Sequence, residues 1–193
     1  MSMRTTSRLL LLLLLLGSSV QAWGSPDCTR HPVYCSMVQL QPHGDREFLL
    51  ELSGYVSQYS RKYGTDWRTS VLVGMLESSL RPVDAYHTCR DAEGRRSMCI
   101  QDLGVWQLNV DTLLDFRPGV DIQALRVDLR EQTRLHILLL RSKVRMCVGR
   151  GVWEKYAWSC YHSVTNKLRI NYIRRGTPYI YILDYLPTGG LGK

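Results

Sequence analysis

The chain lacks several features that would assign a protein to a class directly. After residue 22 no segment is long and apolar enough to span a bilayer, so we expect no membrane insertion of that part of the chain. The sequence has no Cys-x-x-Cys pair, no zinc-finger spacing and no basic run with interleaved aromatic residues, and we expect no nucleic-acid partner. After residue 22 the sequence has no internal repeats or low-complexity stretches, and apolar and polar residues rarely alternate with the period of two that is typical of strands. These absences favour a mainly α-helical globular protein.

The first residues form a pattern typical of a secretory signal peptide. Arg4 and Arg8 precede an unbroken run of leucines, Leu9–Leu16. A stretch of mostly small residues follows and ends at Ala22. Because the apolar run is too short to span a bilayer, we predict a signal peptide over residues 1–22, cleaved after Ala22. No cysteine follows directly, so no lipid attachment is predicted there. We expect the mature protein to be secreted or periplasmic.

The remaining chain has the size of one domain and a moderately basic charge. Removing 22 residues from 193 leaves 171, enough for one hydrophobic core. We expect an N-terminal extension over 23–44, the main domain over 45–186 and a flexible tail over 187–193. The formal charge of +8 includes the two arginines of the leader, and without them it is +6. Such a balance suits an anionic partner, whether nucleic acid, an acidic membrane surface or the cell wall, although a solvated surface rich in arginine also explains it.

Six cysteines follow the predicted signal peptide, and an even number in an exported protein predicts disulfide bonds. Several pairings are open, and the simplest joins sequence neighbours: Cys28 with Cys35, Cys89 with Cys99, and Cys147 with Cys160. A zinc site built from His87, Cys89 and Cys99 is a competing interpretation, which the lack of paired Cys-x-x-Cys spacing disfavours. Cys160 and His162 are a weaker nucleophile pair, because residues two apart on a helix do not face each other.

Apolar residues recur with helical spacing along most of the mature chain. Phe48, Leu52 and Val56 lie on one face of the first predicted helix, which Gly64 ends. His136 lies on the apolar face of a later helix and is expected to be a core residue. The predicted helices cover residues 45–63, 67–79, 127–148, 153–164, 168–175 and 179–186.

Two segments interrupt this helical pattern. Residues 82–103 are polar and irregular and predict a loop, with room for a small β-hairpin between Tyr86 and Val105. Gly176–Pro178 is predicted to separate the last two helices, since proline cannot supply a helical hydrogen bond.

One carboxylate stands at the end of a continuous apolar run. The stretch Val71–Leu76 predicts a buried helix, and Glu77 follows it directly. A glutamate that emerges from an apolar helix is poorly solvated when charged, so its pKa should rise and it can act as a general acid. A solvated glutamate at a helix end is the plain alternative, and only downstream motifs favour the acid.

Those motifs resemble the lysozyme-like fold of the lytic transglycosylases, the family that includes the goose-type lysozymes. The resemblance covers about residues 48–183. Its marks, in chain order, are Glu77-Ser78 followed by Pro82, similar to Glu-Ser-x-x-x-Pro; Gly104-Val105-Trp106-Gln107-Leu108-Asn109, similar to Gly-Leu-Met-Gln-Ile-Asn; Tyr161, in the place of the tyrosine of Ala-Tyr-Asn; and Thr177-Pro178-Tyr179-Ile180, similar to Thr-x-x-Tyr-Val. The chain departs from Ala-Tyr-Asn-x-Gly, because it reads Cys160-Tyr161-His162-Ser163-Val164.

The resemblance implies an enzyme that cleaves the β-1,4 bond between N-acetylmuramic acid and N-acetylglucosamine in peptidoglycan glycan strands, forming a 1,6-anhydro ring. Glu77 would be the catalytic acid and then the base, with no metal or cofactor. The implied substrate-binding residues are Ser78, Trp106, Gln107, Tyr161 and Tyr179. Gln107 would hydrogen-bond a sugar, Trp106 would form an apolar wall, and the two tyrosines would place hydroxyls near Glu77. Ordinary packing is the alternative for each of them. Partners in an envelope complex are not identified by the sequence.

Two other functions remain open at this point. A goose-type lysozyme would activate water with an aspartate roughly 6.5–9.5 Å from the acid, and Asp84, Asp91 and Asp102 are the candidates. Goose-type enzymes look to have an aspartate where this chain has Asn109, which favours the transglycosylase. A catalytically silent peptidoglycan-binding module is the third possibility, and the intact Glu77-Ser78 pair argues against it.

Overall fold

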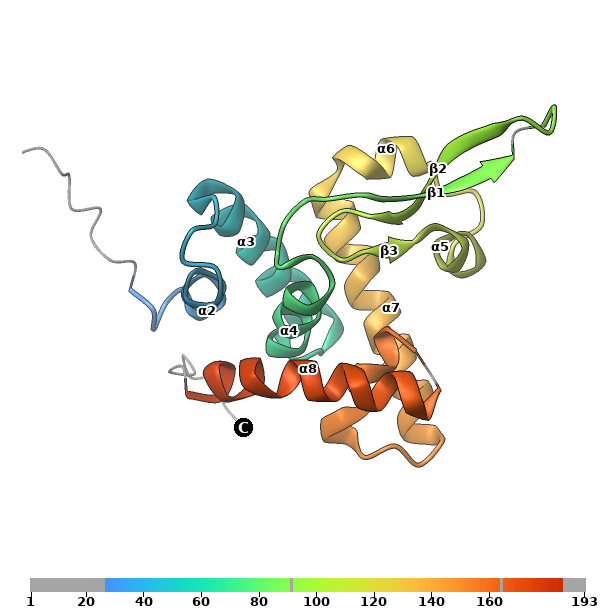
Figure 1. Cartoon of the computed structure of the whole chain (residues 1–193). Coiled ribbons are helices and arrows are strands. Elements are labelled where there is room, and N and C mark those ends of the chain that lie inside the picture. The colour runs from blue at the N-terminus through green and yellow to red at the C-terminus, as the bar shows by residue number, and fades with distance from the viewer. Residues whose placement is uncertain (1–26, 91, 164, 186–193) are drawn as a thin grey trace, which may run out of the picture.

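The structure is a computed structural model that describes residues 27–90, 92–163 and 165–185 (Figure 1). In these residues the protein is mainly helical, with one small antiparallel sheet. The predicted signal peptide and the predicted tail over 187–193 lie outside the described residues. Among the helices described, none is long and apolar enough to cross a bilayer.

The first three helices are placed by their capping residues. They are α2 (Pro32–Leu40), α3 (Arg46–Tyr63) and α4 (Trp67–Ser78). Asp45 and Asp66 cap α3 and α4 by accepting hydrogen bonds from backbone N–H groups of the first turn. Gly64 ends α3 in the left-handed conformation with φ of 64°. The two helices predicted here from periodicity are confirmed, whereas α2, within the predicted extension, was not anticipated.

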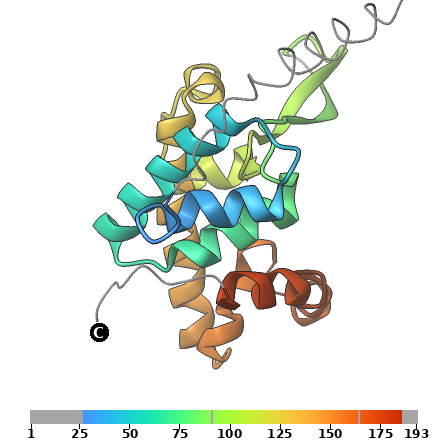
Figure 2. The same ribbon diagram turned by 90° about the vertical axis from the view of Figure 1, so that its left-hand side faces the viewer.

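The polar segment after α4 forms a β-hairpin and a third short strand. The strands are β1 (Ala85–Arg90), β2 (Arg96–Leu103) and β3 (Leu108–Asn109), paired antiparallel in the order β1-β2-β3. Tyr86 pairs with Ile100, and Arg90 with Arg96. Figures 1 and 2 show this hairpin extending away from the helices. The hairpin that the sequence allowed is therefore present, and its two strands occupy most of the segment that was predicted to be a loop.

The second half of the chain returns to helices. They are α5 (Val110–Phe116), α6 (Ile122–Val127), α7 (Leu129–Gly149), the 3₁₀ helix η1 (Glu154–Tyr161) and α8 (Asn166–Tyr185). Figure 2 shows α7 running along the molecule from the level of the sheet to η1. The segment predicted as an α-helix over 153–164 is the 3₁₀ helix η1, and α5 and α6 were not anticipated.

The prediction of two separate C-terminal helices is wrong, because α8 continues through Pro178. Proline removes one hydrogen bond from a helix and crowds the carbonyl four residues before it, so packing must hold the helix together at this point. Tyr172, Gly176 and Leu183 recur with helical spacing and are all buried. This face packs against α4 and η1, and that packing keeps the helix in one piece.

Helix α4 is surrounded on most sides and forms the centre of the core. It packs against α2, α3, α7, α8 and η1. All six residues from Val71 to Leu76 are buried, as the apolar run predicted. A smaller cluster of Cys147, Ala157 and Cys160 joins α7 to η1.

Three disulfides join Cys28 to Cys35, Cys89 to Cys99, and Cys147 to Cys160. The simplest of the pairings left open by the sequence is thus the one present. Because the sulfurs of Cys89 and Cys99 bond each other, they are not thiolates that could ligate zinc with His87. Disulfides persist in oxidising compartments, so the bonds fit an exported protein.

Candidate active site

Glu77 lies in the last turn of α4, just before the helix ends in a tight turn. Ser79 and Leu80 have φ of 57° and 55°, a left-handed conformation that non-glycine residues seldom adopt. The N–H of Leu80 donates to the carbonyl of Gly74, which closes the turn. Such backbone strain persists only where surrounding structure enforces it, and it is common at functional sites. Here buried Leu80 packs into the core and holds the turn.

The Glu77 side chain is largely enclosed by residues from the C-terminal part of the chain. It is 15% exposed, and its Oε1 accepts a hydrogen bond of 2.6 Å from the hydroxyl of Tyr172 on α8. The Nδ1 of His162 lies 3.8 Å from the same oxygen. The imidazole of His162 stacks on the Tyr172 ring, with centroids 4.9 Å apart and planes inclined by 9°.

This environment favours the protonated form of Glu77. Burial deprives the carboxylate of hydration and raises the pKa of Glu77 above its ordinary value. The hydrogen bond from Tyr172 and the charges of His162 and Arg175 lower this pKa, and the charge of Asp102 raises it. Burial outweighs the lowering effects, so the net direction is upward. A carboxyl whose pKa is raised in this way is better suited to act as a general acid.

Tyr172 remains a hydrogen-bond donor at any ordinary pH. Burial and the neighbouring Glu77 carboxylate raise its pKa far above the usual tyrosine value. Its hydroxyl therefore holds the Glu77 carboxyl in one orientation. It also stabilises the negative charge that appears when Glu77 gives up its proton.

The segment Gly104–Gln107 packs beside the end of α4 and is tied to it by Ser78. The Ser78 hydroxyl donates to the carbonyl of Val105 at 2.7 Å and is itself buried. Gly104 has φ of 58°, and a Cβ at this position would collide with the side-chain amide of Gln132. Ser78 therefore serves as a structural tie, which corrects its implied role in contacting the sugar.

Trp106 also belongs to the core and not to a sugar-binding wall. Its side chain is 0% exposed, and its ring stacks on His136 at 4.0 Å between centroids. Its indole N–H donates to Thr133, 3.2 Å away. Tyr161 donates a 2.9 Å hydrogen bond to the Trp106 carbonyl, so this tyrosine positions the backbone before Gln107 and does not bond Glu77.

Gln107 is the residue of this segment whose side chain reaches the surface. Its φ is 44°, the third positive φ at a non-glycine residue among those described. The amide nitrogen donates to the carbonyls of Val83 and Gly104, at 2.6 and 2.8 Å. Within the described residues the amide oxygen accepts no hydrogen bond, so it is the atom that can receive a donor from a ligand.

Tyr179 lies away from Glu77, because α8 is one continuous helix. Tyr172 and Tyr179 are seven residues apart, which places them about 10 Å apart along the axis. Tyr179 is half-buried and packs against the main core. The tyrosine in contact with Glu77 is thus Tyr172, and the structure gives Tyr179 no polar contact with Glu77 in the part of the chain it describes.

The three aspartates considered as a second carboxylate differ in position. Asp84 accepts from the N–H of Gly104 at 3.0 Å and pairs with Arg126 at 2.6 Å, so it is a structural link. Asp91 lies outside the described residues. Asp102 accepts from the side-chain amide of Asn109 at 3.1 Å and is close enough for its charge to raise the pKa of Glu77.

Two residues of the site were missed by the sequence analysis. Tyr172 stood within the short helix predicted over 168–175, and its spacing to Gly176 and Leu183 was a usable signal of burial. His162 was considered only beside Cys160, which is disulfide-bonded. Their convergence on Glu77 depends on how α8 crosses α4, which sequence periodicity does not specify.

Comparisons of the whole chain with known proteins found no match. No protein-family model, no curated protein and no solved structure matches the chain. In the residues that the structure describes, no group of three or more His, Cys, Asp or Glu side chains could hold a metal ion.

Proposed function

We propose that this protein is an exported peptidoglycan lytic transglycosylase with a lysozyme-like fold. It would cleave the β-1,4 bond between N-acetylmuramic acid and N-acetylglucosamine and leave a 1,6-anhydro ring. The observation that carries the proposal is the enclosed carboxyl of Glu77, held by Tyr172 at the end of a buried helix. The sequence motifs around Glu77 and Gln107 add the substrate class.

The proposed reaction begins with Glu77 protonated. Its proton passes to the glycosidic oxygen as the bond to C1 breaks, and positive charge develops on the sugar ring. The resulting carboxylate then accepts the proton of the 6-hydroxyl of N-acetylmuramic acid. The O6 atom bonds to C1, the ring closes, and Glu77 is protonated again. Protons and charge balance with no added water or cofactor.

The neighbouring residues have distinct roles in this scheme. Tyr172 orients the carboxyl and stabilises it while it is ionised, through the 2.6 Å hydrogen bond. The amide oxygen of Gln107 is available to accept a hydrogen bond from a sugar hydroxyl or acetamido group. Ser78, Trp106 and Tyr161 support the segment that presents Gln107.

A hydrolytic muramidase is the second candidate, and the position of Asp102 favours it. Its charge acts on Glu77, so its carboxylate lies in the neighbourhood where an inverting hydrolase needs a base. However, Asp102 accepts a hydrogen bond from Asn109, whose own oxygen caps α5. This bond competes with the activation of a water molecule, so the transglycosylase is our preferred proposal.

The test is digestion of purified peptidoglycan by the mature protein and by Glu77→Gln, followed by mass analysis of the released muropeptides. We expect anhydro products, lighter than the hydrolysed ones by one water. Hydrated products that disappear in Asp102→Asn would support the hydrolase. Glu77→Gln keeps the shape of the site and removes the acid, so full activity in this variant would refute the assigned role. Binding without release of fragments by the unmodified protein would indicate a silent binding module.

A further inference from the structure

Positive charge is distributed unevenly along the chain. Residues 134–175 carry ten arginines and lysines against one acidic residue, Glu154. Residues 23–133 carry twelve basic against fifteen acidic residues. The basic character of the protein therefore comes from the second half of α7, η1 and the start of α8.

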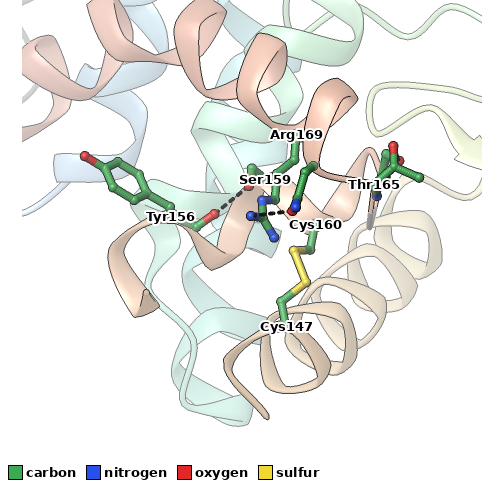
Figure 3. The surroundings of a disulfide bond; sticks show 8 residues. Cys147, Tyr156, Ser159, Cys160, Thr165 and Arg169 are labelled. Atoms are coloured by element: carbon green, nitrogen blue, oxygen red, sulfur yellow. Dashed lines mark hydrogen bonds between the residues drawn. A yellow bond between two sulfur atoms is a disulfide. The ribbon is translucent and has the colours of Figure 1, made fainter. Parts of the chain in front are cut away.

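These three segments are adjacent in space and form one end of the molecule. The Cys147–Cys160 disulfide joins the end of α7 to η1, and α8 also packs on η1. Figure 3 shows the end of α7, η1 and the start of α8, where Arg169 is labelled, around this disulfide. We call residues 141–175 the basic lobe.

Most cations of the basic lobe face solvent. The exposed ones that do not act on Glu77 are Arg145, Arg150, Lys155, Lys167 and Arg174. None of these five forms an ion pair with a carboxylate in the part of the chain that the structure describes. By contrast, Arg117, Arg126 and Arg134 elsewhere are paired with Glu131 or Asp84. Unneutralised, clustered cations attract an anionic partner.

The same lobe exposes large apolar side chains. Trp153 is 71% exposed in the turn between α7 and η1, and Val148 is 43% exposed just before it. Leu168 and Ile170, in the first turns of α8, are 48% and 53% exposed. The ammonium group of Lys155 lies 5.3 Å from the centre of the Trp153 ring. The lobe thus combines an exposed indole, aliphatic side chains and cations.

We propose that the basic lobe is a peripheral membrane-contact surface that docks the protein on anionic phospholipid. Lysine and arginine near a membrane surface are attracted to acidic headgroups, and tryptophan partitions to the interface between headgroups and acyl chains. The turn carrying Val148 and Trp153 would enter the interface, with Arg150 and Lys155 at headgroup level. The Cys147–Cys160 disulfide fixes the turn behind them. The protein stays on the surface, since no described helix can span the bilayer.

The exposed apolar side chains favour a lipid surface over a soluble polyanion. A wall polymer or nucleic acid would use the cations, but the aliphatic Val148 would gain nothing from a phosphate chain. In a bilayer interface Val148 and the nearby Trp153 lose contact with water, which favours binding in proportion to the apolar surface removed. The proposal is independent of the chemistry at Glu77.

Vesicle sedimentation tests the proposal. We expect the mature protein to sediment with vesicles of phosphatidylcholine mixed with phosphatidylglycerol, to stay in solution with phosphatidylcholine alone, and to dissociate as salt is raised. The double variant Arg150→Glu/Lys155→Glu should weaken sedimentation at least about tenfold, because each lysine or arginine near the membrane surface contributes about 1 kcal/mol to binding. Trp153→Ala should weaken it as well. All three positions are exposed, so the variants should unfold at the same temperature as the unmodified protein.

The matched control is Arg61→Glu/Arg96→Glu, which changes net charge equally on exposed residues of α3 and β2. This control should bind as the unmodified protein does. No sedimentation with phosphatidylglycerol vesicles at low salt would overturn the proposal. Equal weakening by the control pair would also overturn it. Unchanged vesicle binding by Trp153→Ala, together with tighter binding of soluble polyphosphate, would overturn it too and would assign the lobe to a polyanion.

Discussion

The hydroxyl of Tyr172 donates its hydrogen bond to the same oxygen of Glu77 that faces His162. These two partners come from α8 and from the turn before it, whereas Glu77 ends α4. The contact spans 95 positions of the sequence. The orientation of Glu77, the acid of the proposed reaction, therefore depends on how α8 packs. This dependence can be tested directly.

Replacing Tyr172 with Phe should change both the rate and the pH profile. The hydrogen bond stabilises the carboxylate and lowers the pKa of Glu77, so its loss should raise that pKa further. The alkaline limb of kcat/KM for peptidoglycan cleavage should move to higher pH. The maximal rate should fall roughly ten- to hundredfold, as for a lost hydrogen bond to a charged group.

Tyr179→Phe is the matched control for that experiment. It removes a hydroxyl from the same helix at a position that has no polar contact with Glu77 among the described residues. Its pH profile should overlay that of the unmodified protein. If both tyrosine variants shift the alkaline limb equally, the hydrogen bond to Tyr172 is not the cause.

Glu77→Gln should alter stability in a pH-dependent way. The folded-state pKa of Glu77 is raised above its ordinary value of 4.5, so the stability it contributes is present below that value and is lost as pH rises through the folded pKa. Glutamine does not ionise. The free energy of unfolding of the variant, relative to the unmodified protein, should therefore increase with pH over this window and then level off. Urea unfolding of both proteins at acid, neutral and alkaline pH measures the difference, and a constant difference would contradict burial as the dominant cause.

The sequence predicted the helix that carries Glu77 better than the side chains that contact Glu77. The apolar run Val71–Leu76 identified the buried helix and its terminal Glu77, because burial on all sides leaves a continuous hydrophobic pattern. Gly64 marked the end of α3 for a local reason of capping. Such features depend on neighbours in sequence, so they could be read without the fold.

The errors arose where distant packing overrides local preference. Gly176 and Pro178 suggested a break, yet Gly176 is the residue whose missing side chain lets α8 approach Trp158 and Leu76. The resemblance of Thr177-Pro178-Tyr179-Ile180 to Thr-x-x-Tyr-Val directed attention to Tyr179 instead of Tyr172. The motif around Trp106 left open both a sugar-binding wall and a place in the core, and its indole fills the core beside His136.

His136→Phe should stabilise the protein, most strongly in acid. His136 is fully buried, and neither ring nitrogen has a hydrogen-bond partner among the described residues. Burial lowers the pKa of His136 from 6.5 to about 3, so stability is present above pH 6.5 and is lost as pH falls toward 3. Phenylalanine keeps the stack on Trp106 and takes up no proton. The gain should approach about 4 kcal/mol near pH 3, measured by urea unfolding, and a gain that is the same at pH 7 and pH 4 would refute this origin.

Two glycine-to-alanine substitutions in helices should have opposite effects. Gly54 in α3 is exposed and a Cβ there would meet nothing within 4 Å, so alanine should stabilise by about 0.5–1 kcal/mol through helix propensity. At Gly176 a Cβ would lie 2.6 Å from the Trp158 ring and 3.2 Å from a Leu76 methyl group. Alanine should therefore push α8 from α4 and destabilise by roughly 1–3 kcal/mol, despite the same gain in propensity. Because Leu76 precedes Glu77, Gly176→Ala should also reduce peptidoglycan cleavage, while Gly54→Ala leaves it unchanged. Equal shifts in the urea midpoint for the two variants would show that the close approach of α8 to α4 carries no stability.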